Sequence, residues 1–84
     1  MKRELILSEL ENLAERMGIE IRYEKMGTLS GGLCRLRDGK IILINKKLSD
    51  ISKIELLAAE LSREKEALEN LYILPEIREL LGLK

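Results

Sequence analysis

Few residues of this 84-residue sequence could carry out chemistry, and the single cysteine is the first to consider. Cys34 could act as a nucleophile or a redox sensor if the guanidinium of neighbouring Arg35 stabilised its thiolate. The chain has no histidine to serve as its base, however, and adjacent residues of a strand point to opposite faces. We therefore interpret Cys34 as a small buried hydrophobic residue. One cysteine and no histidine also argue against zinc, and we expect neither a metal nor a cofactor.

The carboxylates and the glycine-rich segment do not form a recognisable catalytic set either. Glu60 and Glu64 have helical spacing and basic neighbours, which indicates a solvated helix face rather than an acid–base pair in a pocket. Ser30-Gly31-Gly32 lacks the Gly-Lys-Ser/Thr ending of a phosphate-binding loop and does not open a helix, so it indicates a bulge. We therefore expect no enzymatic activity.

Basic residues are concentrated in the middle of the chain, although the formal net charge of the whole is zero. Residues 22–53 carry a net charge of +5, whereas both flanking segments are acidic. A phosphate or nucleic-acid ligand could bind the basic hairpin of this region. The candidate anion-binding residues are Arg35, Arg37, Lys40, Lys46 and Lys47. No aromatic residue lies among them to stack on a base, so nucleic-acid binding is the alternative function and not the first.

Composition and length place the chain among small folded proteins. Hydrophobic residues make up 45% and charged residues 36% of it, which gives enough apolar surface to fold as one domain, residues 1–84. A surface of Glu, Lys and Arg without Gln or His resembles proteins from hot environments. No apolar stretch is long enough to span a membrane, and the N-terminus lacks a cleavage site, so we expect a cytoplasmic protein.

Apolar spacing predicts a helix followed by a strand at the start of the chain. Residues 3–17 place Ile6, Leu10, Leu13 and Met17 on one stripe, and Gly18 follows where a left-handed cap belongs. Apolar and charged residues then alternate through 19–24, which indicates a half-buried strand.

Asp38-Gly39 between two apolar runs, 33–37 and 40–45, predicts a β-hairpin with a two-residue turn. That turn would pair Cys34 with Leu43 and Leu36 with Ile41, and these four residues would share the core face. The opposite face would then carry three apolar residues beside Arg35, Arg37 and Lys40; they are Leu33, Ile42 and Ile44.

Two further helices are expected in the C-terminal half. The first spans 50–64 with Ser49 or Asp50 as its cap, or starts later with a capping box of Ser52 and Glu55. It bends or stops in the charged segment 63–69, although one longer helix is also compatible with the spacing. The second spans 75–81, with Pro75 in its first turn and Gly82 closing it. The fold class is thus α+β, in the order helix, three strands, two helices, with the strands forming an antiparallel meander and the helices packed on one face.

The second face of the hairpin leads to a hypothesis about function. Ile42 and Ile44 beside Leu33 would form an apolar surface that a second copy covers, because the helices already occupy the first face. We therefore expect a homodimer, and a non-enzymatic protein that acts through contacts with itself and with a protein partner.

The segment from Gly31 to Lys40, GGLCRLRDGK, followed by Ile42-Leu43-Ile44-Asn45, resembles small uncharacterised bacterial proteins of this length. The run from the hairpin through Leu57–Arg63 is also similar to the strand and active-site helix of zinc metallopeptidases, whose helix carries His-Glu-x-x-His. Here Ala59 and Arg63 occupy the histidine positions and only Glu60 matches. The resemblance implies a shared α+β core with the catalysis lost and with binding or regulation as the remaining role.

Overall fold

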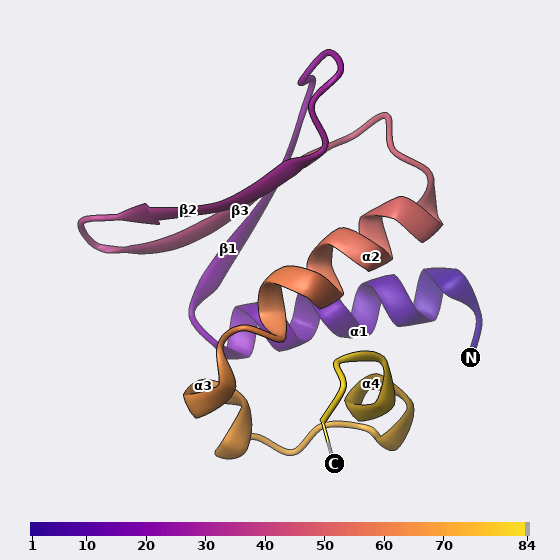
Figure 1. Cartoon of the computed structure of the whole chain (residues 1–84), viewed down its shortest axis with the longest axis vertical. Helices are drawn as coiled ribbons and strands as arrows, with labels where there is room; N and C mark the ends of the chain where they lie inside the picture. The colour runs from indigo at the N-terminus through magenta and orange to yellow at the C-terminus, as the bar shows by residue number, and fades with distance from the viewer. Residues whose placement is uncertain (84) are drawn as a thin grey trace.

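A computed structural model describes residues 1–83 and shows a layer of helices packed on one face of a small β-sheet (Figure 1). The fold class is α+β, as expected from the sequence. In chain order the elements are α1 (Arg3–Arg16), β1 (Ile19–Glu24), β2 (Gly31–Leu36), β3 (Gly39–Asn45), α2 (Asp50–Leu61), α3 (Lys65–Glu69) and α4 (Pro75–Leu80).

The sheet is not the antiparallel meander that the sequence suggested. Its strand order is β1-β3-β2, with β1 parallel to β3 and only β2 antiparallel to it. The chain leaves β1 at one edge and enters β2 at the other, so the connection 25–30 must pass the end of β3. The buried Asn45 holds it there, because its side-chain amide donates to the carbonyls of Gly27, at 3.1 Å, and Leu29, at 2.8 Å.

The hairpin itself is confirmed, but its register and its buried face differ from the prediction. Leu36 pairs with Gly39, so Cys34 lies opposite Ile41 instead of Leu43. The two faces keep the expected members, yet the helices cover the face that was predicted to be outside. Ile42 and Ile44 are 0% exposed and Cys34 is exposed, so the core-face prediction was wrong.

The third strand explains why this face is buried. The parallel register places Ile21 beside Ile42 and Tyr23 beside Ile44, which extends one apolar layer across the sheet. The opposite choice would bury the charged residues of β1, at a high cost in desolvation. The hairpin alternation taken alone cannot distinguish the two faces, because both of them carry apolar residues.

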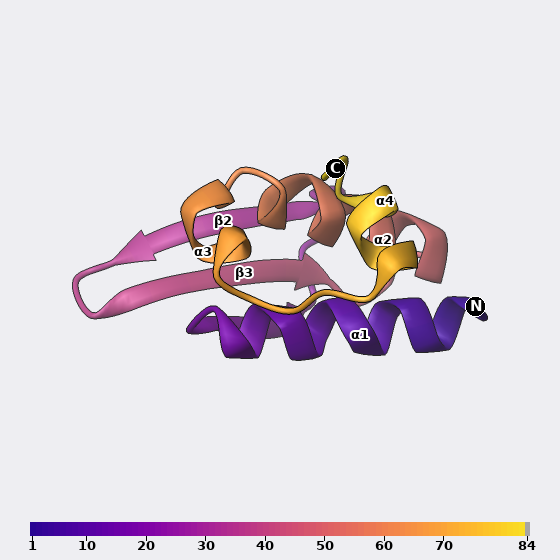
Figure 2. The same ribbon diagram turned by 90° about the horizontal axis from the view of Figure 1, so that it is seen from below.

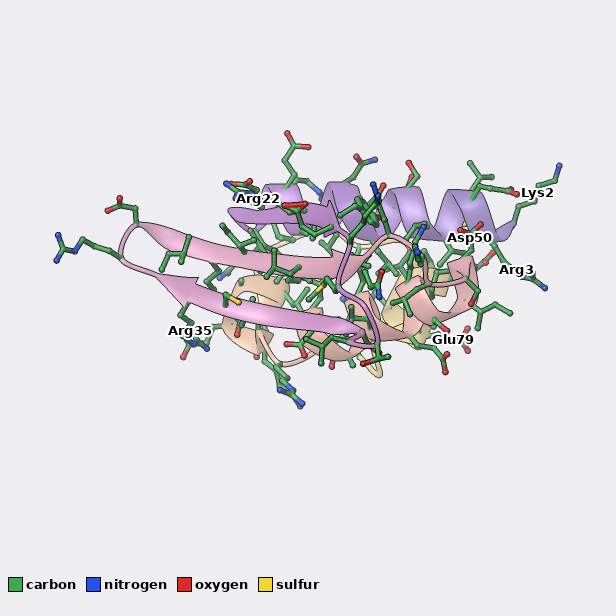
Figure 3. All side chains as sticks on the ribbon, turned by 90° about the horizontal axis from the view of Figure 1, so that it is seen from above. Lys2, Arg3, Arg22, Arg35, Asp50 and Glu79 are labelled. Carbon is green, nitrogen blue, oxygen red and sulfur yellow. The ribbon has the colours of Figure 1, made fainter. Side chains whose placement is uncertain are left out.

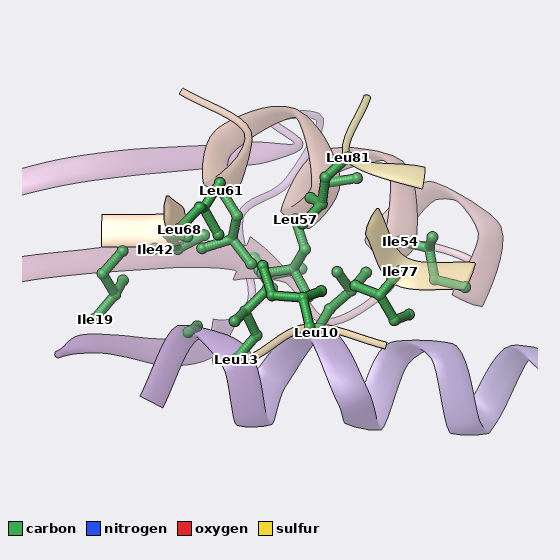
Figure 4. Packing of buried hydrophobic residues seen from close by; sticks show 14 residues of the cluster. Leu10, Leu13, Ile19, Ile42, Ile54, Leu57, Leu61, Leu68, Ile77 and Leu81 are labelled. Carbon is green, nitrogen blue, oxygen red and sulfur yellow. The ribbon is translucent and has the colours of Figure 1, made fainter. Parts of the chain in front are cut away.

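The core lies between this face and the helices (Figure 4). Leu10 and Leu13 of α1 meet Leu57 and Leu61 of α2, and all four side chains are 0–1% exposed. Ser49 caps α2 by accepting a hydrogen bond from the Ser52 amide, at 3.2 Å.

The predicted helix 50–64 ends at Leu61, and the charged segment after it forms the separate short helix α3, whose Leu68 also enters the core. Among residues 1–83, no helix is long and apolar enough to cross a membrane.

Candidate interaction surface

The face of the sheet that points away from the helices is uncovered. α1 packs on β1, and α2 packs on β2 and β3, all from the same side (Figures 2 and 3). In the observed register Gly32, Cys34 and Leu36 share the other face with Ile41 and Leu43. On this face β1 contributes charged residues, so the apolar part belongs to the hairpin.

An apolar patch occupies this uncovered face and continues onto the connection 25–30. Leu29 is 65% and Leu36 is 54% exposed, whereas Leu43 and Met26 are half-buried. A shallow hollow of about 260 Å³ lies within it, lined by Met26, Leu29, Leu43 and the segment 30–34. We name the following residues the open-face patch: Met26, Leu29, Cys34, Leu36 and Leu43.

Three residues that build this surface were not predicted from the sequence: Met26 and Leu29, which lie in it, and the buried Asn45, which supports it. Besides its two donated hydrogen bonds, its Oδ1 accepts from the Lys47 amide, at 3.1 Å. It therefore holds the connection that presents Met26 and Leu29. The position of Asn45 at the end of an apolar strand was its only signal in the sequence, and an asparagine there is equally compatible with an ordinary turn.

The outer edge of β2 adjoins the open-face patch and has free backbone groups. The Asn45 amide donates to the Ser30 carbonyl, at 2.9 Å, which makes these two residues a hydrogen-bonded pair. Such pairs alternate with non-bonded pairs along an antiparallel ladder, so Gly31, Leu33 and Arg35 direct their N–H and C=O groups away from β3. No hydrogen bond to these groups from another element is found among residues 1–83.

Leu33, Ile42 and Ile44 were predicted to form a dimer interface, but they lie on the opposite face of the sheet from this surface. Ile42 and Ile44 are enclosed in the protein's own core, on the face where α2 packs on β3. Leu33 is half-buried against the same core. Their side chains therefore stabilise the fold, because the apolar alternation of β1 places this face beneath the helices.

The predicted anion-binding residues are divided between the two ends of the hairpin. Arg35 and Lys40 lie opposite each other, and Arg37 is in the turn beside them. Lys46 and Lys47 follow the other end of β3, about 20 Å away at the usual rise of a strand. Lys40 is also neutralised by an ion pair with Glu64, so the structure does not bring the five cations together.

A second, larger cleft of about 610 Å³ lies on the other side of the sheet, between α1 and β1, and carboxylates line it. At its wall the Tyr23 hydroxyl donates a hydrogen bond to Glu11, and Lys53 lies over the Tyr23 ring, 5.3 Å from its centre. Burial and the neighbouring carboxylate raise the pKa of Tyr23 well above the ordinary value near 10. This phenol is therefore a neutral donor that connects α1 to β1.

The positions that correspond to the metallopeptidase motif form no metal centre. On α2, Ala59 is exposed and Glu60 is half-buried, and Arg63 is exposed just after the helix. Among residues 1–83 there is no group of three or more His, Cys, Asp or Glu side chains that could hold a metal ion. Comparisons with protein-family models, with curated proteins and with solved structures found no match.

Proposed function

We propose that this chain is a non-enzymatic interaction protein that acts as a homodimer. The observation that carries the proposal is an exposed apolar patch on the open face of the sheet, next to the outer edge of β2 with its unpaired backbone groups. Surfaces of this kind mark protein–protein contacts in folded proteins. Catalysis has less support, because the exposed thiol of Cys34 has no histidine as a base.

The amount of exposed surface supports association. One copy exposes 5761 Å², whereas a compact monomer of 9.6 kDa is expected to expose about 5,100 Å². The surplus of roughly 650 Å² is close to the ~800 Å² that each partner contributes to a standard interface. If each copy buried about this area in a dimer, its remaining exposed surface would be close to that expected for a compact chain of its mass.

Anion binding, the alternative expected from the sequence, has less support from the geometry. The candidate cations are separated by the length of β3, and Lys40 already has a carboxylate partner. A nucleic-acid ligand would therefore meet only Arg35 and Arg37 at one end of the hairpin.

The experiment that tests the proposal is light scattering on the full chain over a wide range of concentration. We expect a species of twice the 9.6 kDa of one chain, which dissociates only on strong dilution. Added duplex DNA at low salt should leave this species unchanged. A monomer at every concentration would overturn the proposal.

A further inference from the structure

We propose that the β2 edges of two copies pair antiparallel about a two-fold axis at Leu33, and that Leu36 of each copy enters the open-face hollow of the other. This inference rests on the proposed homodimer and specifies its interface. The pairing would join two three-stranded sheets into one sheet of six strands, with the helices of both copies on the same side.

The free backbone groups determine this register. Gly31, Leu33 and Arg35 point outward, and hydrogen-bonded pairs across a new antiparallel interface must form between such residues. Centring the axis on Leu33 uses all of them: Leu33 pairs with Leu33 of the second copy, and Gly31 pairs with its Arg35. Each of these pairs can exchange both of its hydrogen bonds.

Side-chain sizes along β2 complement each other in this register. Arg35 lies opposite Gly31 of the second copy, and Cys34 lies opposite its Gly32. The two glycines thus leave room for the two larger side chains that approach them. Gly32 has no atom within 4 Å of where a Cβ would stand, apart from its chain neighbours, so this space is open in the single copy.

The same register also brings two exposed leucines, Leu36 of one copy and Leu29 of the other, into contact. The same register places Leu36 beside Ser30 of the second copy, on the open face of the joined sheet. The hollow lined by Leu29, Leu43 and segment 30–34 lies directly there. Leu36 and Leu29, which are 54% and 65% exposed in one copy, would therefore cover each other across the interface.

The shape of the molecule favours edge pairing over stacking of the two open faces. One copy measures 35 × 34 × 16 Å, and its short dimension runs across the strands (Figures 1 and 3). A second copy at the β2 edge adds to this short dimension and gives a body of nearly equal sides. Stacking of the faces would extend an already long dimension and leave the β2 backbone groups unpaired.

Disulfide trapping with Gly32→Cys tests the register. The introduced thiol would lie opposite Cys34 of the second copy in a non-hydrogen-bonded pair, where Cα atoms are about 4.5 Å apart and a disulfide can form. We expect mild oxidation to convert nearly all of this variant into a covalent dimer on a non-reducing gel. The double variant Gly32→Cys, Cys34→Ala has the same introduced thiol without its partner and should remain uncrosslinked.

The possible outcomes separate the register from the dimer itself. If the Gly32→Cys variant is a dimer by light scattering but does not crosslink, the register is wrong and the homodimer stands. If the unmodified chain crosslinks efficiently through Cys34 alone, the axis lies at Cys34, which also overturns this register. If the chain is a monomer throughout, both proposals fail.

Leu36→Glu tests the contact with the hollow, and Leu5→Glu is its matched control. Leu5 is 55% exposed on α1, far from the β2 edge, so the two substitutions introduce the same charge at equally exposed leucines. We expect Leu36→Glu to raise the dimer dissociation constant about a hundredfold and Leu5→Glu to leave it unchanged. Equal dissociation constants for the two variants would exclude Leu36 from the interface.

Discussion

The two edges of the sheet are protected to very different degrees. At the β1 edge every second side chain is charged, and Arg22 forms an ion pair with Glu20. Helix α1 packs against this strand, and its Glu11 accepts a hydrogen bond from the Tyr23 hydroxyl. At the β2 edge the sequence GGLCRL has one charge, no proline and exposed apolar side chains. An edge strand with many charged side chains resists pairing with another strand, whereas an edge with few charges and exposed apolar residues favours it. The β1 edge is therefore protected within one copy, and the β2 edge is where we propose that a second copy pairs.

The comparison of the two edges can be tested first at Gly31, where β2 is attached to β3. A methyl group at Gly31 would overlap the carbonyl oxygen of Leu43, and the backbone there has φ +128°, which side-chain-bearing residues rarely adopt. We expect Gly31→Ala to lower the free energy of unfolding by about 3 kcal/mol, measured by urea denaturation at a protein concentration where the wild type and the variant are both monomeric.

Gly32→Ala is the control for this prediction, because Gly32 has no positive φ and its Cβ direction is open. Its effect on the free energy of unfolding should remain within about 0.5 kcal/mol. If Gly31→Ala and Gly32→Ala lower the free energy of unfolding by similar amounts, the close approach of Gly31 to the Leu43 carbonyl is not what makes this position sensitive.

The connection between the two edges gives the next largest effect. Asn45→Ala removes the side-chain hydrogen bonds to Gly27 and Leu29, and leaves the two carbonyls without that donor. We expect a loss of about 2 kcal/mol in the free energy of unfolding, and faster tryptic cleavage after Lys25.

The matched control for this variant is Asn70→Ala. Asn70 also donates its side-chain amide to a backbone carbonyl, that of Glu66, but at an exposed position. A change of less than about 0.5 kcal/mol is expected there. If the two variants lose equal stability, the connection 25–30 is not held by Asn45.

The sequence was sufficient for elements whose signal is local. The periodicity of α1, the alternation of β1 and the Pro75 start of α4 each depend on neighbouring residues, and all three elements formed as expected. The hairpin was also predicted, because Asp38-Gly39 restricts the turn to a few residues.

The predictions that were wrong depend on contacts between segments that lie far apart in the sequence. The choice between the two hairpin faces depends on β1, whose parallel pairing with β3 has no local sequence signal. Without it Cys34 was placed inside, and Ile42 and Ile44 were placed at the surface. The candidate interaction surface was therefore predicted on the wrong face, although the hairpin that carries it was correct.

The smallest expected effect concerns the protected edge and depends on pH. Tyr23 donates to Glu11, and burial and this carboxylate raise its pKa in the folded protein above the value near 10 of the unfolded chain. The contribution of this phenol to stability is thus complete below about pH 10 and declines as the pH rises towards the folded pKa, because the unfolded chain ionises first.

Tyr23→Phe should cost about 1 kcal/mol at neutral pH, since the ring and its contact with Lys53 remain and only the hydroxyl is lost. The difference in free energy of unfolding between wild type and variant, measured by urea denaturation, should shrink between neutral pH and about pH 11. Tyr72→Phe, at a residue that is 74% exposed, should show no such difference at either pH. If the Tyr23→Phe deficit is the same at both pH values, ionisation of the Tyr23 hydroxyl does not weaken the link between the β1 edge and α1, and the hydrogen bond to Glu11 is not its source.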